Sequence, residues 1–501
     1  MATQTLDRPQ AAPPGTAEHF DVLVVGAGIS GVGAAWHLTH QLPGTSFVVL
    51  EALGSYGGTW LSHNFPGIRS DSDLYTFGYR FKPWVGPPIA TAAEIQSYIG
   101  SVIDESDLGQ HIRYGHRIDT ASWDSKANRW TIEAVRTDTG EKRVFTANFL
   151  WMCQGYYRHR QGFMPDWPGM KDYKGKLVHA EEWPEDLDYA GKRVLVIGSG
   201  ATAATIIPEM AKTAAHVTML QRSPTYFIPG LNEDVLANQL RALQVDEAWI
   251  HEIVRKQRNF EQKELTRRCF EEPEVVREEL LTAVRSLLPE GYDMKHFTPH
   301  YRPWRQRVAF VPDGDLFAGI SAGKASVVTD EIDHFTDKGI ALKSGESLEA
   351  DIIVAATGFN LNVLGDIQFV IDGQPLDFSK TVTWRGMMFT GVPNMVWVFG
   401  YFRASWTLRA DMVADFVCRL LPHMKKKGAH AVVPALRPED HNMTLGPWIE
   451  EENMNSGYLA RGMHLLPRAG DKPEWRHSQD YWTEKDMFPS IDLDDAALKY
   501  S

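Results

Sequence analysis

The stretch Phe20-Asp-Val-Leu-Val-Val-Gly-Ala-Gly-Ile-Ser-Gly31 decides the fold of the first part of the chain. Its β-branched first half predicts a strand buried in a parallel sheet, and residues 32–40 continue as a helix. In the G-x-G-x-x-G turn, Gly26 permits the tight bend, Gly28 lets the backbone approach a pyrophosphate, and Gly31 lets the helix pack on the strand. The stretch therefore predicts a strand–turn–helix unit that holds a dinucleotide on a helix N-terminus.

An acidic residue at the end of the next strand strengthens this prediction. The strand at residues 47–50 is followed by Glu51, which lies 20 residues after Gly31, the spacing of an acid that accepts hydrogen bonds from an adenosine ribose. Ser30, inside the turn, adds a hydroxyl or amide donor. The alternative is a structural glycine turn with an exposed Glu, and the complete context weighs against it.

A second unit of the same kind follows far along the chain. The strand at residues 192–197 leads into a glycine turn and a helix that runs to about Lys212. After the next strand, residues 217–220, Arg222 and Ser223 stand where an acid would otherwise bind a 2′-hydroxyl, so the site favours the 2′-phosphate of NADPH over NADH. The predicted contacts in this turn are Gly198, Ser199, Gly200, Ala201, Thr202, Ala203 and Ala204.

Composition excludes several classes of protein. The 501 residues include 51 Lys and Arg against 64 Asp and Glu, a net charge of −13 that disfavours nucleic acids and anionic membranes. Three separated cysteines form neither a C-x-x-C pair nor a zinc motif, and no metal site is predicted. Residues 1–18 lack the apolar core of a signal peptide or anchor, which predicts a disordered leader and a cytoplasmic protein without a membrane span.

Two further segments resemble a known family. They are Gly57-Gly-Thr-Trp60 with Phe65-Pro-Gly-Ile-Arg-Ser-Asp71, and Tyr173-x-Gly-x-x-x-His-x-x-x-Trp-Pro184. Together with both glycine turns they resemble the type I Baeyer–Villiger monooxygenases, class B flavoproteins, most closely the ethionamide-activating branch. The chain departs from the family at Tyr173, where Phe is usual, and at Gln306, where several relatives have Lys.

The resemblance implies an α/β fold of two Rossmann-like dinucleotide-binding domains, the second inserted into the first, with a helical insertion. FAD would occupy the first site and NADPH the second. The expected divisions are a leader at 1–18, an FAD-binding domain at 19–155 and 356–501, an NADPH-binding domain at 156–231 and 303–355, and a helical lobe at 232–302.

The resemblance also implies the reaction and its residues. A C4a-peroxyflavin would insert oxygen beside a ketone carbonyl to give an ester or lactone, with Arg307 as the catalytic cation and Asp71 as its partner. His179 would orient the two domains, and Ile118 would contact FAD through its backbone or pack in the core. The other residues expected near FAD or the nicotinamide are Gly58, Thr59, Trp60, Ser62, Arg69, Ser70 and Asp71.

Other functions remain open at this point. A flavin-containing monooxygenase that oxygenates nitrogen or sulfur uses the same cofactors, and sulfide or thioamide oxidation is a plausible side activity. A non-enzymatic nucleotide-binding redox sensor is a distant alternative. The expected partners are a small ketone or sulfide and O2, and the expected assembly is a monomer or homodimer.

Overall fold

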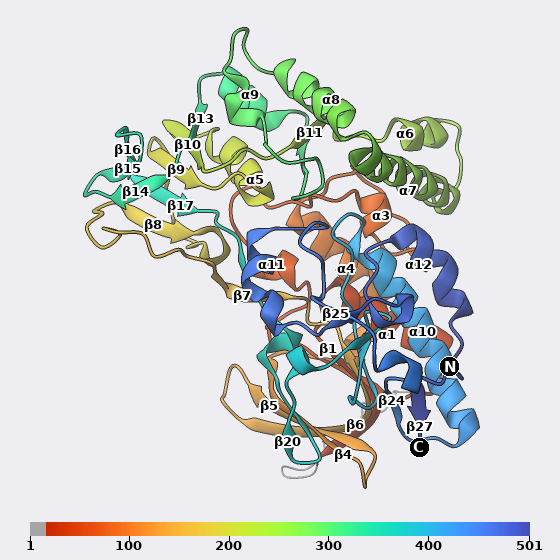
Figure 1. The fold of residues 1–501 in the computed structure, drawn as a ribbon. Helices are drawn as coiled ribbons and strands as arrows, with labels where there is room; N and C mark the ends of the chain where they lie inside the picture. The colour runs from red at the N-terminus through yellow and green to blue at the C-terminus, as the bar shows by residue number, and fades with distance from the viewer. Residues whose placement is uncertain (1–16) are drawn as a thin grey trace, which may run out of the picture.

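The computed structural model describes residues 17–501 and contains two main sheets (Figure 1). The larger has nine strands, in the order β20-β19-β4-β5-β6-β1-β2-β3 with β23 beside β6. Its strands are β1 Glu18–Val25, β2 Phe47–Leu50, β3 Ile112–Arg113, β4 His116–Asp124, β5 Arg129–Arg136, β6 Lys142–Met152, β19 Gln368–Ile371, β20 Gln374–Pro375 and β23 Met395–Trp397.

The predicted strand–turn–helix unit lies at the centre of this sheet. β1 pairs in parallel with β2 on one side and with β6 on the other. All of β2 and the second half of β1 are buried, as their unbroken apolar sequence predicts. Helix α1, Ile29–Gln41, packs between this sheet and α10, Trp406–Lys427, while α4, Ala92–Glu105, contacts its flank.

The smaller sheet has five parallel strands in the order β13-β10-β9-β17-β8. Helices α5, Ala201–Met210, and α9, Asp315–Ser321, pack together beside it. Two Rossmann-like units in an α/β chain confirm the predicted fold class. The strands are β8 Lys176–His179, β9 Arg193–Ile197, β10 His216–Gln221, β13 Ala325–Thr329 and β17 Ile352–Ala355.

The chain passes between the two sheets through one pair of strands. β7, Tyr157–Gly162, carries the chain from the larger sheet to the smaller one. It pairs antiparallel with β18, Phe359–Leu361, which carries the chain back to the larger sheet. His179 packs closely here, because a Cβ added to Gly162 would lie 1.8 Å from its ring. The larger sheet thus takes strands from both sides of the segment that builds the smaller one (Figure 1).

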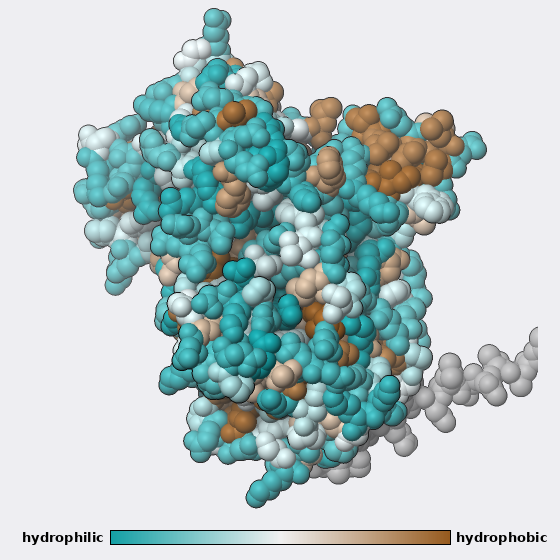
Figure 2. Space-filling view, turned by 45° about the vertical axis from the view of Figure 1, so that its right-hand side comes forward, coloured by the Kyte–Doolittle hydropathy of each residue, from teal (hydrophilic) through white to brown (hydrophobic). Residues whose placement is uncertain are grey.

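Three helices fill the range predicted as a helical lobe. They are α6 Val235–Ala242, α7 Glu247–Glu271 and α8 Pro273–Arg285. Figure 2 shows apolar side chains gathered on this lobe, where Val235, Leu243 and Trp249 are each more than half exposed. None of these three lines the cavity described below, so they belong to the lobe's outer surface.

Shorter elements complete the fold. The predicted leader lies outside the described residues except for its last two, and Glu18 already begins β1. Within residues 17–501, no helix combines the length and apolar character needed to cross a membrane. The remaining helices and longer strands are α2 Thr59–Ser62, α3 Leu74–Phe77, α11 Gly457–Gly462, α12 Tyr481–Met487, β11 Phe227–Gly230, β12 Ala309–Pro312, β14 Ile332–Phe335, β15 Gly339–Leu342, β16 Ser347–Glu349, β24 Val432–Pro434 and β27 Leu498–Tyr500.

The shortest elements are two-residue strands and 3-10 turns. Besides β3 and β20 of the larger sheet, the two-residue strands are β21 Thr383–Trp384, β22 Met388–Phe389, β25 Leu445–Gly446 and β26 Ala469–Gly470. The 3-10 turns are Leu108–His111, Ala180–Glu182, Met294–Phe297, Leu364–Asp366, Phe378–Lys380, Pro438–Asp440, Met463–Leu465, Pro473–Trp475 and Phe488–Ser490.

Candidate active site

One cavity of about 1400 Å³ is lined by both predicted dinucleotide sites. The first glycine turn (Gly26–Gly31) and the second glycine turn (Gly198–Ala203) both contribute wall residues, and so do Asp71 and Arg307. Pockets for a single small ligand usually hold about 300–1000 Å³, so this cavity has room for more than a small substrate. The residues predicted for two cofactors and for catalysis therefore meet in one space.

The first glycine turn has the close contacts that its glycines predict. Gly26 has a φ of +97°, and a Cβ at Gly31 would lie 1.8 Å from the Gly26 carbonyl oxygen. Gly28 faces a second turn, because a Cβ on Gly58 would lie 3.1 Å from the Gly28 Cα. Gly28 and Gly58, which have no side chains, thus line the cavity next to each other, and this bare backbone fits the pyrophosphate of FAD.

Glu51 is fixed at the end of β2 by backbone donors. Its Oε2 accepts a hydrogen bond from the Ala27 amide, and its Oε1 accepts one from the Leu53 amide, each at 2.7 Å. Burial raises the pKa of the Glu51 carboxyl, while these hydrogen bonds act in the opposite direction. The carboxylate lies on the cavity wall, at the place predicted for a ribose.

The second glycine turn leaves an open cradle. Gly198 has a φ of +134°, and a Cβ there would lie 2.4 Å from the Ala356 carbonyl oxygen. A Cβ at Gly200, by contrast, would meet no protein atom within 4 Å, although Gly200 lines the cavity. The space beside Gly200 is open and lies at the N-terminus of α5, where backbone amides can bind a phosphate group.

The cation predicted for the 2′-phosphate lies beside this cradle. β10 ends at Gln221, whose amide donates inward to the His296 carbonyl and the Thr329 hydroxyl. The next residue, Arg222, is exposed and lines the cavity. Ser199 of the turn donates to the Ser223 carbonyl at 3.1 Å and so joins the turn to the segment that carries Arg222.

Arg307 forms a two-point ion pair with Asp71. Its Nη2 donates to Oδ1 at 2.7 Å, and its Nε lies 2.5 Å from Oδ2. Burial acts to lower the pKa of the guanidinium, but the charge and hydrogen bond of Asp71 together with the nearby Tyr156 and Tyr157 outweigh it, and the pKa lies above its usual value. The site therefore holds a permanent cation whose orientation is set by a carboxylate.

The loop that carries Arg307 has a constrained backbone. Trp304 adopts a φ of +61°, which bulky side chains rarely do, and its ring is buried with Tyr226 and Cys269. The buried ring stabilises this backbone conformation, and constrained conformations of this kind concentrate at functional sites. Three residues beyond it, Arg307 reaches the cavity wall.

A second ion pair joins the loop that carries Asp71 to helix α9 beside the smaller sheet. Arg69 donates through Nη1 and Nη2 to the two carboxylate oxygens of Asp315, at 2.5 and 3.2 Å. Arg69 was expected near the nicotinamide, and it does line the cavity. Asp315, at the start of α9, was not predicted as its partner.

The structure separates the predicted contact residues into two groups. Thr59, Trp60 and Ile118 line the cavity, as do Ser30 and Ser223. Gly31 packs behind the first turn, as predicted for it. The predicted contacts that do not reach the wall are Ser62, Ser70, Ala203 and Ala204.

Ser62 and Ser70 instead bond within the protein. Ser62 shares a hydrogen bond of 2.9 Å with His159, and Ser70 donates to the Ser72 carbonyl. Ala203 and Ala204 are buried among the residues of the smaller sheet's core. Helical spacing explains both alanines, because Ala201, Thr202 and Thr205 lie on the face of α5 that lines the cavity, and Ala203 and Ala204 lie on the opposite face.

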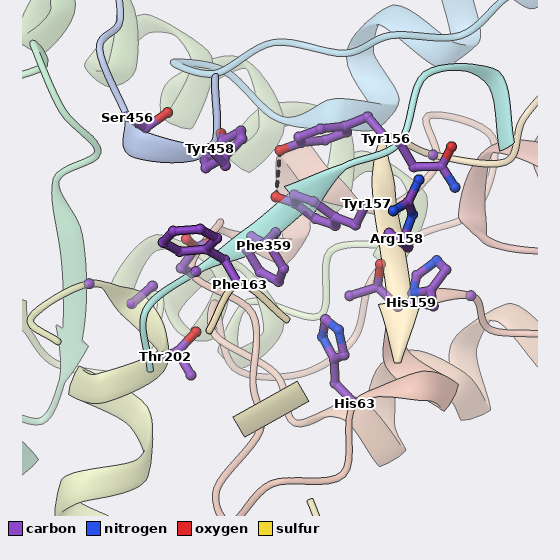
Figure 3. A pocket seen from close by; sticks show the side chains of 18 of the residues that line it. His63, Tyr156, Tyr157, Arg158, His159, Phe163, Thr202, Phe359, Ser456 and Tyr458 are labelled. Atoms are coloured by element: carbon purple, nitrogen blue, oxygen red, sulfur yellow. Dashed lines mark hydrogen bonds between the residues drawn. The ribbon is translucent and has the colours of Figure 1, made fainter. Parts of the chain in front are cut away.

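Sequence reasoning missed an aromatic end of the cavity. Tyr156, Tyr157, Phe359 and Tyr458 line it together (Figure 3). Trp406 stacks on Tyr156 and donates from Nε1 to the Ser30 hydroxyl at 2.7 Å. Only their position in the sequence could have predicted this. The two tyrosines follow the carboxyl end of β6, and ligands of parallel sheets bind at that end of the strands.

The amino-acid sequence of the chain is similar to those of known monooxygenases. Residues 87–364 match the family described as "Flavin-binding monooxygenase-like", and residues 24–84 match "NAD(P)-binding Rossmann-like domain". The chain is 45% identical over 492 residues to "FAD-containing monooxygenase EthA" of Mycolicibacterium smegmatis, covering 97% of each. It is 42% identical to "Putative FAD-containing monooxygenase MymA" of Mycobacterium tuberculosis, covering 97% of this chain and 98% of the relative.

Solved structures share the fold at low sequence identity. "Oxidized steroid monooxygenase bound to NADP" superposes with a TM-score of 0.74 at 22% identity, covering 96% of this chain and 99% of the other. A cyclohexanone monooxygenase bound to ε-caprolactone gives 0.73 at 20% identity, with 97% and 100% covered. These likenesses concern the fold, which is the arrangement of two Rossmann-like units described above.

Proposed function

The chain belongs to the flavin-binding monooxygenase-like family, and from this premise we propose that it is a Baeyer–Villiger monooxygenase. It is an FAD- and NADPH-dependent oxygenating enzyme. The proposed reaction inserts one oxygen atom of O2 beside a ketone carbonyl and gives an ester or a lactone. Oxidation of a sulfide or thioamide sulfur is the proposed side activity.

The Arg307–Asp71 ion pair carries the proposal. Oxygen insertion into a ketone develops negative charge on oxygen, and a fixed cation in a site shielded from water stabilises such charge strongly. Arg307 stays charged at any working pH, so it holds an anion without giving it a proton. It lines the same cavity as the two glycine turns, where the reacting groups would meet.

The residues present fit both cofactors. The bare backbone at Gly28 and Gly58 with the Glu51 carboxylate suits the pyrophosphate and ribose of FAD, and Gly200 with Arg222 suits the phosphates of NADPH. Bound FAD supplies the activation of O2, for which no side chain has the chemistry. Asp71 keeps the Arg307 guanidinium in place.

One experiment separates the proposed reaction from its alternatives. The purified yellow enzyme receives NADPH, 18O2 and a panel of linear, cyclic and aryl ketones together with an alkyl aryl sulfide. Ester or lactone carrying one labelled oxygen supports the proposal. Sulfoxide alone favours an N- or S-oxygenating enzyme, and H2O2 alone overturns both.

We predict that Arg222→Ala lowers the preference for NADPH over NADH by about 10- to 100-fold. A charge-assisted hydrogen bond contributes about 1.5–3 kcal/mol to binding. The substitution removes such bonds from NADPH only, because NADH has no 2′-phosphate. KM for each nucleotide, measured by its oxidation, tests the prediction. Arg143→Ala, which removes a half-buried cation of β6 that pairs with Glu141, is the control. An unchanged preference in Arg222→Ala would reject the phosphate contact.

We also propose that the protein is cytoplasmic and that it is a monomer or a homodimer. The three cysteines are buried and unpaired, which suits a reducing compartment. Fractionation and sedimentation of the purified enzyme test these two points separately.

A further inference from the structure

Two consecutive tyrosines meet at the aromatic end of the cavity. The hydroxyls of Tyr156 and Tyr157 lie 2.5 Å apart and share a hydrogen bond (Figure 3). Successive side chains of an extended strand point to opposite faces, so this convergence requires a bend. Tyr156 itself lies in that bend, after Gly155 with its φ of +77° and before β7, which begins at Tyr157.

Aromatic stacking holds each tyrosine ring in place. Tyr156 stacks on Trp406 with ring centres 5.2 Å apart, and Tyr157 stacks on Phe359 at 3.9 Å. Trp406 is itself held by its hydrogen bond to Ser30. The hydroxyl pair is therefore a rigid feature of the cavity wall, in the way that preorganised donors must be.

The pair has a donor to spare. The Tyr156 hydroxyl also shares a hydrogen bond with Tyr458; when Tyr156 donates to Tyr157, the hydrogen of the Tyr157 hydroxyl is the one left to donate into the cavity. Burial raises the pKa of both tyrosines well above the usual value, so both remain protonated. The Arg307 charge acts on the pKa of both, which places the cation and the hydroxyls in one electrostatic environment.

We infer that the Tyr156–Tyr157 hydroxyl pair binds the carbonyl oxygen of the ketone substrate. This inference rests on the proposed function and names the part of the cavity that receives the substrate. The walls around the pair are aromatic, with Phe163, Phe359 and Tyr458 on the cavity surface. The substrates that fit are therefore apolar ketones with a flat group beside the carbonyl, such as aryl ketones.

The chemistry explains why neutral donors suit this position. The carbonyl oxygen gains negative charge as the carbonyl carbon is attacked, and a hydrogen bond to it strengthens during that change. A hydroxyl that accepts from a second hydroxyl is polarised and donates more strongly. Arg307 is then left to hold the attacking oxygen, so each oxygen has its own partner.

Ketones and sulfides together provide the test. A sulfide has no carbonyl oxygen, so loss of the donor should not affect its oxidation. We expect Tyr157→Phe, which keeps the stack on Phe359, to lower kcat/KM for acetophenone about 10- to 100-fold, mostly in kcat. Oxidation of methyl phenyl sulfide should stay within about twofold of wild type.

Matched variants and outcomes make the result decisive. Tyr156→Phe repeats the test if Tyr157→Phe fails to bind FAD, and Tyr500→Phe removes a hydroxyl at the C-terminus that donates to the Leu493 carbonyl. A parallel loss of both activities, or an unchanged ketone rate, would overturn the inference. If the wild-type enzyme gives no ester from any ketone, the proposed function fails instead.

Discussion

Arg307→Ala is expected to lower kcat for ketone oxygenation about 100- to 1000-fold, the size of effect seen when a fixed stabiliser of developing oxygen charge is removed. The variant loses the only group of its ion pair that can hold an anion, and Asp71 is left on the cavity wall as a negative charge. NADPH oxidation that yields H2O2 in place of ester is the expected residual activity. Ester formation and H2O2 release, measured in parallel, check both statements.

A control on the same loop separates chemistry from folding. Arg305→Ala removes a cation two residues away that does not line the cavity, and it should leave the ester rate within about twofold. Arg307→Lys keeps the charge but cannot pair with Asp71 through two nitrogens, so its rate should be intermediate. An Arg307→Ala enzyme with a near wild-type ester rate would disprove the catalytic assignment.

The two dinucleotide units are predictable because their determinants are local. A β-branched run, a glycine turn and a helix lie within about 20 residues, and Phe47–Leu50 becomes β2 with the predicted bounds. The steric reason for Gly31 is also local, since its neighbour is Gly26 of the same turn. Such features need no knowledge of the rest of the chain.

The substrate end of the cavity is not predictable in this way. Trp406 reaches Ser30 across 376 positions of sequence, and Arg69 reaches Asp315 across 246. No periodicity or spacing encodes such pairs, because tertiary packing alone brings them together. Scattered tryptophans also divide between roles, since Trp397 and Trp475 are fully buried in the core while Trp406 lines the cavity.

The predicted contacts that failed to reach the cavity show a further limit. A family segment identifies a loop, but the side chain of each residue in it turns according to local hydrogen bonds. Ser70 points to the Ser72 carbonyl, while its neighbour Asp71 meets Arg307. Residue type and position therefore predict which loop lines the site. The backbone geometry of the loop decides which of its side chains reach the cavity.

Gly31→Ala is expected to cost about 3 kcal/mol of folding free energy, the upper end of the usual cost of overpacking. The new Cβ would lie 1.8 Å from the Gly26 carbonyl oxygen, which is backbone and cannot turn aside as a side chain would. Relief requires α1 to move away from β1, and that displaces the turn predicted to hold the FAD pyrophosphate. The purified variant should therefore melt at a lower temperature and carry little flavin.

Gly319→Ala makes the same chemical change where there is room for it. Gly319 lies inside α9, and its Cβ would come no closer than 3.8 Å to Ala325. Ala is favoured over Gly in a helix by about 1 kcal/mol, so this variant should melt at or above the wild-type temperature with full flavin content. Helix propensity favours Ala at both positions. A lower melting temperature for Gly31→Ala and a higher one for Gly319→Ala would therefore be caused by the close contact at Gly31. A Gly31→Ala enzyme that melts like wild type and keeps its flavin absorbance would show that the close contact at Gly26 does not limit stability.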